Sequence, residues 1–309
     1  MLKDQLPRIS LAALAFPQIS WSIPLASGAC DCWQNKEDGL LFTSHTVIDF
    51  RSLADYVDSV PDVIDDHDAN ANAQATSAYF GTSAWSDFFN LQTWGTDDTP
   101  VKMINSRNNA YIQQDTEDST YLTLRTHRSS EFQSAAEAES IVDDFTTVSM
   151  RMRARVHGDS GACAGFFTYK ADEDSGVQHE SDIEFLTVDS ATTMHYTTHP
   201  EEENNNNDGE FSVAATLSNA WTDWQEHRLD WTQSATTFYV NGEQNGQLEH
   251  EVAQVPSYLI FNMWSWGNNE WEQEMDVGGT AYLDVQYIEI AYNTSGGSST
   301  SCSNICFLG

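Results

Sequence analysis

The stretch HESDIEFL, residues 179–186, alternates between two kinds of side chain and indicates the architecture of the chain. Successive side chains of a β-strand point to opposite faces, so every second residue shares a face. The acidic face of a strand here would carry Glu180, Asp182 and Glu184, and side chains suited to a core would occupy the other face. We therefore predict a strand with one polar face and one face packed in the interior.

The same period of two recurs along the chain. Residues 148–156 alternate between apolar side chains and Arg151, Arg153 and Arg155, which we predict to be structural. Asn241-Gly242 is typical of a tight hairpin turn. The sequence shows no pattern of a long helix, so we predict an all-β sandwich or barrel. Further candidate strands cover residues 121–126, 165–169, 193–198, 226–231, 237–240, 259–266 and 281–290.

Length and charge limit the organisation and the partners of the chain. Its 309 residues include 47 Asp and Glu against 13 Lys and Arg, which gives a formal net charge of -34. Phosphate backbones and anionic membranes attract cationic surfaces, so we expect neither as a partner, whereas a neutral polysaccharide meets no repulsion. We predict one domain over residues 29–295, a loop over residues 57–77, and a loose Ser/Gly-rich tail over residues 296–309.

The first 28 residues have the features of a secretory signal. Lys3 and Arg8 give a basic start, and a short apolar run and small residues follow. An ordinary N-terminal arm is the alternative. Asn293 begins an N-glycosylation sequon, which suits an extracellular protein. We therefore predict residues 1–28 as a signal peptide and the protein as secreted.

Four cysteines lie in pairs near the two ends of the chain. Cys30 and Cys32 follow the predicted signal, and Cys302 and Cys306 lie in the tail. In a secreted chain such pairs form disulfides, and both cross-terminal pairing and a local Cys302–Cys306 bridge fit the spacing. The fifth cysteine, Cys163, is predicted to be a buried structural thiol, because no activating arrangement surrounds it in the sequence.

The acid row of residues 180–184 has the side chains that glycoside cleavage needs. One carboxyl can protonate the leaving oxygen while another attacks the sugar carbon or activates water. The pattern alone is weak evidence, since composition predicts roughly one such triplet in a chain this acidic. A second row does exist at Glu270, Glu272 and Glu274, continued by Asp276. The alternative for either row is a solvated strand face.

Three tryptophans lie close together downstream of the first acid row. Trp264, Trp266 and Trp271 fall within eight residues, and the first two share a strand face by spacing. Sugar rings present apolar C–H faces that pack on aromatic rings, so we predict that these residues bind substrate. Packing in the core is the alternative for each.

Around the first acid row the sequence resembles glycoside hydrolase family 16, to which lichenases and laminarinases belong. Residues 180–186 look like the E-x-D-x-E signature of that family. Residues 132–135 and 145–155 upstream, and residues 227–242 downstream, resemble further motifs in the expected order. The resemblance runs from about residue 85 to residue 292. Two departures concern substrate choice: Ser181 replaces a usual Ile or Leu, and residues 164–167 replace a Trp-Pro-aromatic run.

The resemblance implies a jelly-roll β-sandwich of two antiparallel sheets with a concave substrate groove, and a retaining double displacement. By position, Glu180 would be the nucleophile, Glu184 the general acid/base, and Asp182 an electrostatic assistant. Phe167 would join the three tryptophans in binding sugar. The second acid row matches no catalytic position and is assigned to the surface or to the groove rim. No cofactor or metal is expected, although this fold can hold a structural Ca²⁺.

Three functions fit this resemblance. The first is a secreted, monomeric endo-β-glucanase that hydrolyses β-1,3- or mixed β-1,3-1,4-glucan. The second is a cell-wall transglycosylase, in which an acceptor sugar replaces water. The third is a non-catalytic carbohydrate-binding protein on the same fold, against which the presence of all three acids argues.

Overall fold

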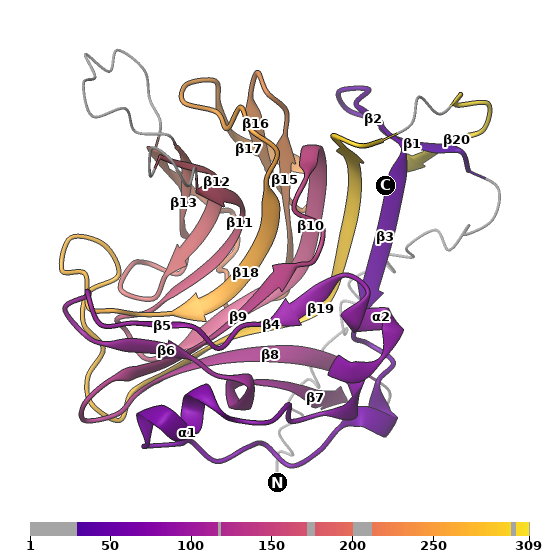
Figure 1. The fold of residues 1–309 in the computed structure, drawn as a ribbon. Helices are drawn as coiled ribbons and strands as arrows, with labels where there is room; N and C mark the ends of the chain where they lie inside the picture. Colours follow the sequence, from indigo (N-terminus) through magenta and orange to yellow (C-terminus); the bar gives the residue numbers. More distant parts are fainter. Residues whose placement is uncertain (1–29, 117–118, 172–176, 200–211, 298–300, 309) are drawn as a thin grey trace, which may run out of the picture.

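The computed structural model describes residues 30–308, apart from residues 117–118, 172–176, 200–211 and 298–300. The predicted signal peptide lies outside the described residues. Strands dominate the described chain, as the sequence predicts, and its helices are all short (Figure 1). The helical segments are α1 (His67–Ala71), α2 (Ser83–Ser86) and three 3-10 turns at Ala54–Tyr56, Ala78–Gly81 and Arg107–Asn109.

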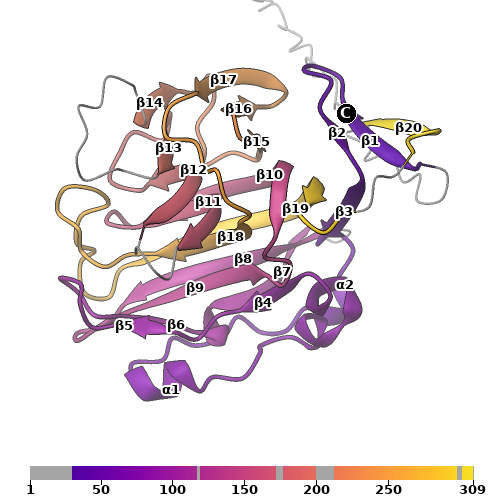
Figure 2. The same ribbon diagram turned by 45° about the horizontal axis from the view of Figure 1, so that its top comes forward.

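Two curved sheets make up the body of the molecule, and strand β9 joins them (Figure 1, Figure 2). In order of pairing, the first sheet contains β17 (Glu243–Leu248), β16 (Thr236–Val240), β15 (Gln225–Trp231), β10 (Phe145–Gly158), β19 (Thr280–Thr294), β8 (Ser119–Arg128) and β7 (Ala110–Thr116). The second contains β14 (Ser212–Thr216), β13 (Thr193–His199), β12 (Gln178–Leu186), β11 (Cys163–Ala171), β18 (Tyr258–Trp264), β9 (Gln133–Ser140) and β4 (Phe89–Leu91). Three more strands lie along these sheets: β3 (Ser44–Asp49) pairs with β19, β6 (Met103–Asn105) pairs with β9, and β5 (Gly95–Thr96) pairs with β6. This arrangement confirms the predicted jelly-roll β-sandwich.

The core between the sheets follows the predicted alternation. The apolar residues of 148–156 are at most 1% exposed and belong to one buried cluster. On the opposite face of β10, Arg155 donates to Asp284 at 2.9 Å, and Asp284 is itself 1% exposed. The pairing supplies the charge that a buried carboxylate needs, so the prediction of a structural role is confirmed for this arginine. Asn241 and Gly242 connect β16 to β17 with φ values of 50° and 83°, as the predicted hairpin requires.

The two ends of the described chain form a small separate sheet. Strand β1 (Cys32–Asn35) pairs antiparallel with β2 (Leu41–Phe42) and parallel with β20 (Ile305–Leu308). Disulfides join Cys30 to Cys306 and Cys32 to Cys302. Cross-terminal pairing is therefore the arrangement, and the local Cys302–Cys306 bridge is excluded. The prediction of a loose tail is wrong for β20, because pairing with β1 supplies backbone hydrogen bonds that a Ser/Gly-rich composition does not reveal.

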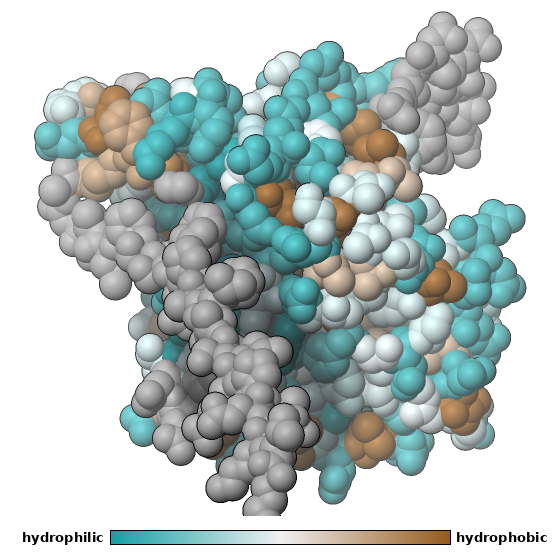
Figure 3. All heavy atoms as spheres, turned by 180° about the vertical axis from the view of Figure 1, so that it is seen from behind, coloured by the Kyte–Doolittle hydropathy of each residue, from teal (hydrophilic) through white to brown (hydrophobic). Residues whose placement is uncertain are grey.

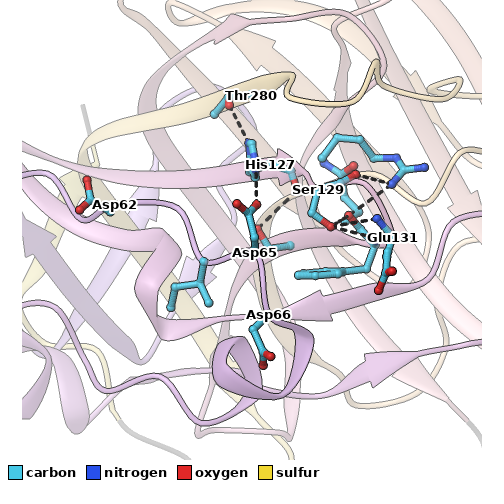
Figure 4. A network of polar contacts seen from close by, with 12 residues as sticks. Asp62, Asp65, Asp66, His127, Ser129, Glu131 and Thr280 are labelled. Atoms are coloured by element: carbon cyan, nitrogen blue, oxygen red, sulfur yellow. Dashed lines mark hydrogen bonds and ion pairs between the residues drawn. The ribbon is translucent and has the colours of Figure 1, made fainter.

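The predicted loop at residues 57–77 is mostly irregular, with α1 inside it, and it is fixed to the first sheet. Buried Arg125 of β8 donates to the carbonyl of Pro61 at 2.7 Å. Asp65 lies 3.7 Å from His127, whose other ring nitrogen bonds Thr280 at 3.1 Å (Figure 4). These contacts connect three segments that are distant in the sequence.

The surface of the molecule is largely polar on the face opposite to that of Figure 1 (Figure 3). The face seen in Figure 3 is mainly hydrophilic, and its apolar side chains are scattered. Within the described residues, no helix combines the length and the apolar character that crossing a membrane would require.

Candidate active site

Strand β12 lies inside the second sheet, and its acidic face forms the floor of a groove. Glu180, Asp182 and Glu184 all line one open cavity of about 380 Å³. Ser181 and Ile183, which alternate with them, are completely buried on the other face. The strand and its two faces are therefore as the sequence predicts, and three acids share one concave site.

Aromatic side chains from neighbouring strands line the same groove. Phe167 of β11 and Trp264 of β18 belong to its lining, together with Trp266. The rings of Trp264 and Trp266 lie 4.5 Å apart. Tyr169 and Tyr258 add a second aromatic pair, with ring centroids 5.5 Å apart, directly across the β11–β18 ladder. Three of the four residues predicted to bind substrate therefore line the groove, and their contact with a substrate stays a prediction.

Trp271 has a different position from the other predicted aromatic residues. It lies in the loop that follows β18 and is not among the residues that line the groove cavity. Its indole Nε1 donates to Oε1 of Glu184 at 3.3 Å, and its ring lies edge-on to His195 at 4.9 Å. Trp271 thus contacts an acid of the row, a partner that the sequence pattern does not reveal.

Glu180 and Asp182 form one coupled pair. Burial raises the pKa of both carboxyls, and for Asp182, which is 4% exposed, their mutual repulsion raises it further. A hydrogen bond between the two side chains opposes the rise at Glu180. Two like charges this close in a poorly solvated site favour one shared proton. The more buried partner, Asp182, is the better place for it, which leaves Glu180 ionised.

Glu184 has a pKa that burial raises above its ordinary value. Three neighbours oppose the rise. Cys163 and Trp271 donate hydrogen bonds to it, and His195 lies directly opposite it on β13. His195 is itself bound to Asp189 through a 2.6 Å contact. The acid therefore lies in a largely desolvated site with hydrogen-bond donors on one side.

Two further acids in the groove are absent from the sequence prediction. Glu137 of β9 accepts hydrogen bonds from Trp94 at 2.8 Å and from Asn262 at 3.2 Å, and burial raises its pKa to about 7. Glu139, two residues along, also lines the cavity. The signal was available, because residues 136–140 alternate acids with alanines in the period of a strand.

The side chains of the acid row could also bind a cation. Glu180, Asp182 and His199 each bring one ligand atom within 4.8 Å of the others. Two of these three groups are the coupled carboxyls described above, so a cation would compete with the shared proton. The expectation that no cofactor is needed stays a prediction.

The second acid row does not form a strand. Residues 265–279 lie between β18 and β19 without regular structure. Glu274 is exposed and pairs with Arg128 at 2.9 Å, whereas Glu272 is completely buried. Oε1 of Glu272 accepts the backbone N–H groups of Trp266 and Asn268 at 3.1 and 3.0 Å. The surface assignment is therefore wrong for Glu272, because its carboxylate replaces backbone hydrogen bonds that the irregular loop lacks.

Asn293, the predicted glycosylation site, lies near the end of β19. Its amide nitrogen donates to the carbonyl of Leu41 at 3.0 Å, and its oxygen accepts from the backbone of Thr43 at 3.0 Å. The side chain connects β19 to the segment before β3. Its glycosylation stays a prediction.

A family model decides the classification of this site. The model for glycosyl hydrolases family 16 matches residues 97–287, which include the acid row and most of both sheets.

The chain belongs to glycosyl hydrolase family 16.

Curated relatives agree with this membership. The β-glucanase of Bacillus subtilis is 26% identical over 123 residues, which are 39% of this chain and 48% of the relative. A β-glucanase of Acetivibrio thermocellus is 25% identical over 146 residues, 47% of this chain and 42% of the relative. The chain thus spans about half the length, or less, of these two relatives.

Solved glucanase structures share the fold. A β-1,3-1,4-glucanase derived from a mouse hindgut metagenome superposes with a TM-score of 0.57 at 17% identity, covering 81% of this chain and 99% of the other. An endo-β-1,3-glucanase from Pyrococcus furiosus gives 0.57 at 14% identity, covering 86% and 99%. At these identities the likeness concerns the fold alone.

Proposed function

We propose that this family 16 protein is a secreted endo-β-glucanase that hydrolyses β-1,3- or mixed β-1,3-1,4-glucan with retention of configuration. The observation that carries the proposal is the joint position of Glu180, Asp182 and Glu184 on the floor of one aromatic-lined groove. An open groove suits an internal segment of a long chain. Membership of the family supports glycoside hydrolysis, and the names of the relatives support a glucan.

In the first step, Glu180 is the nucleophile. Its carboxylate attacks the anomeric carbon while Glu184 gives its proton to the departing glycosidic oxygen, so that a covalent glycosyl-enzyme forms. Asp182 keeps the shared proton and donates a hydrogen bond to Glu180, which keeps the attacking group ionised. The free chain with its new hydroxyl then leaves.

In the second step, Glu184 acts as a base. Now ionised, it takes a proton from water, and the water oxygen attacks the anomeric carbon from the side that the leaving group vacated. Glu180 departs as a carboxylate, and Glu184 is protonated again. Two inversions return the original configuration.

The charges of the groove support a neutral substrate. The charged residues that line it are Glu137, Glu139, Glu180, Asp182 and Glu184, and the lining contains no Lys or Arg among the described residues. A polysaccharide with carboxylate or sulfate groups would meet only repulsion there. Extracellular action is supported by the two disulfides, because such bonds persist in oxidising compartments.

The test measures alanine variants on lichenan and laminarin, and azide rescue of these variants on an aryl β-glycoside of a short glucan, whose phenolate leaves without a proton from the enzyme. Glu180→Ala and Glu184→Ala should each lose activity, by roughly 10²- to 10⁴-fold for loss of the acid. Azide should then attack the anomeric carbon, in place of the missing nucleophile in the first variant and in place of the base-activated water in the second. The first variant should yield an α-glycosyl azide and the second a β-glycosyl azide, because azide attacks from opposite sides. Glu274→Gln is the matched control and should keep wild-type activity.

Three results would contradict the proposal. Products longer than the supplied chains would indicate a transglycosylase. Glucan binding without turnover by the wild type would indicate a carbohydrate-binding protein. Azide products of the reversed configurations would show that Glu184 is the nucleophile and Glu180 the acid/base.

A further inference from the structure

Glu184 is held by two donors that converge on a single oxygen. The Cys163 thiol donates to Oε1 at 3.3 Å, and the Trp271 indole donates to the same atom at 3.3 Å. Its other oxygen, Oε2, makes no hydrogen bond within the described part of the chain. The protonated acid therefore carries its proton on Oε2 while Oε1 accepts, since one oxygen cannot readily hold the proton and receive two donors.

The position of Cys163 is set by strand register. On β11 it lies opposite Leu186 of β12 and opposite Trp264 of β18, and it shares the groove-facing side with Gly165, the direct neighbour of Glu184. The thiol is completely buried, and this burial, together with the nearby Glu184, raises its pKa well above the ordinary value. It thus stays protonated and acts as a donor, not as a nucleophile.

The second donor is held by Glu272. This buried carboxylate binds the backbone N–H groups of Trp266 and Asn268, which lie on the same loop as Trp271. The loop is therefore fixed where Trp271 can reach Glu184. One oxygen of the acid is thus fixed from two independent elements, β11 and the loop after β18.

We propose that Cys163 is a positioning residue for the acid/base, whose thiol fixes Oε1 of Glu184 and thereby presents the catalytic proton on Oε2 toward the groove. The inference rests on the role proposed for Glu184. Cys163, the one cysteine outside the two disulfides, would then position a catalytic group in addition to filling space in the core.

Other charged groups also face Glu184, and the test must separate the thiol from them. Glu180 and Asp182 lie on its own strand, His195 lies opposite on β13, and Glu272 lies in the loop after β18. Glu272 repels the Glu184 charge and His195 attracts it. All four groups are left intact when only Cys163 is changed.

The experiment compares Cys163→Ala with Cys163→Ser in the pH profile of kcat/KM on lichenan. The alanine removes the donor, so the alkaline limb, which reports the acid, should move up by roughly half a unit to one unit, with kcat falling roughly tenfold. The serine offers a stronger donor, so its limb should stay in place or move down. Trp271→Phe removes the other donor and should move the limb in the same direction as the alanine.

A purely structural role predicts a different pattern. If the alanine and serine variants shift the limb equally, or not at all, while melting temperatures fall, Cys163 only fills space and the inference is wrong. Titration of ¹³C-labelled glutamate carboxyls by NMR gives a readout that needs no turnover, with the Glu184 signal assigned from its loss in Glu184→Gln. An unshifted Glu184 titration in Cys163→Ala overturns the inference even if the wild type hydrolyses no glucan.

Discussion

The two acid rows of this chain have the same spacing and opposite structural outcomes. Glu180, Asp182 and Glu184 occupy a strand between two others, so all three point into one groove. Glu270, Glu272 and Glu274 occupy an irregular loop, where the first is exposed, the second is buried, and the third pairs with Arg128. Spacing therefore decides which acids share a face only where neighbouring strands hold the backbone extended.

The rows differ in what surrounds them as well as in backbone. Core residues such as Ile183 alternate with the acids of the first row, and strand β11 beside it carries the aromatic side chains of Phe167 and Tyr169. The second has Trp271, Gln273 and Met275 between its acids, and Gln273 has a φ of 65°, which breaks the alternation. The loop nevertheless serves the strand, because it brings Trp271 to Glu184.

The largest effect within the second row is expected at Glu272. Glu272→Ala leaves two backbone N–H groups without their acceptor, which should cost roughly 2 kcal/mol of unfolding free energy. The loosened loop should also release Trp271 and lower kcat roughly tenfold. Glu270→Ala, at an exposed position, should change the free energy of unfolding by less than about 0.5 kcal/mol. Urea unfolding and kinetics on lichenan measure both, and equal effects of the two changes would contradict the assigned role of Glu272.

A smaller effect is expected on the pH dependence of stability. Burial raises the pKa of the coupled carboxyls Glu180 and Asp182, so the folded protein holds the shared proton of this pair more tightly than the unfolded chain does. Stability from this pair is therefore complete at acid pH and is lost as the pH rises above the ordinary carboxyl range. Glu180→Gln should raise the melting temperature by roughly a few degrees at the alkaline end and leave it unchanged near pH 4.

Exposed Glu270 provides the control for that experiment. Glu270→Gln should leave the difference in melting temperature between the two pH values as it is in the wild type. Calorimetry across the range checks both variants. A Glu180→Gln protein that is less stable than the wild type at alkaline pH would show that the carboxylate is well solvated or paired when folded.

The smallest effect concerns Glu139, at the edge of the groove. Burial raises its pKa, and its carboxyl makes no hydrogen bond within the described part of the chain. Glu139→Gln should change kcat/KM on neutral glucan by less than about threefold, but raise it several-fold on a carboxymethylated glucan, because one repulsive charge is lost. Glu131→Gln, at a surface position, should have neither effect. If Glu139→Gln leaves the ratio of kcat/KM between the two substrates unchanged, Glu139 does not contribute to the discrimination against charged substrates.

The sequence reveals the strands and the acid row because both depend on local alternation. The faces of residues 148–156 and 179–186, and the hairpin at Asn241-Gly242, follow from single residues and their spacing. The contacts of Cys163 and Glu272 do not, because they depend on which strands pair and how a loop folds over them. The pairing of β1 with β20 cannot be predicted from local sequence for the same reason, since Cys32 and Cys302 have a sequence separation of 270.

Those two terminal disulfides also change the covalent shape of the protein. With Cys30 bound to Cys306 and Cys32 to Cys302, the backbone between them is a closed ring. A protease that cuts one surface loop between these cysteines opens the ring but does not divide it, so both fragments stay in one molecule until the bridges are reduced. Because the disulfides already join residues 30–32 to residues 302–306, new chain ends could be made in a hairpin far from the groove while these segments stay linked.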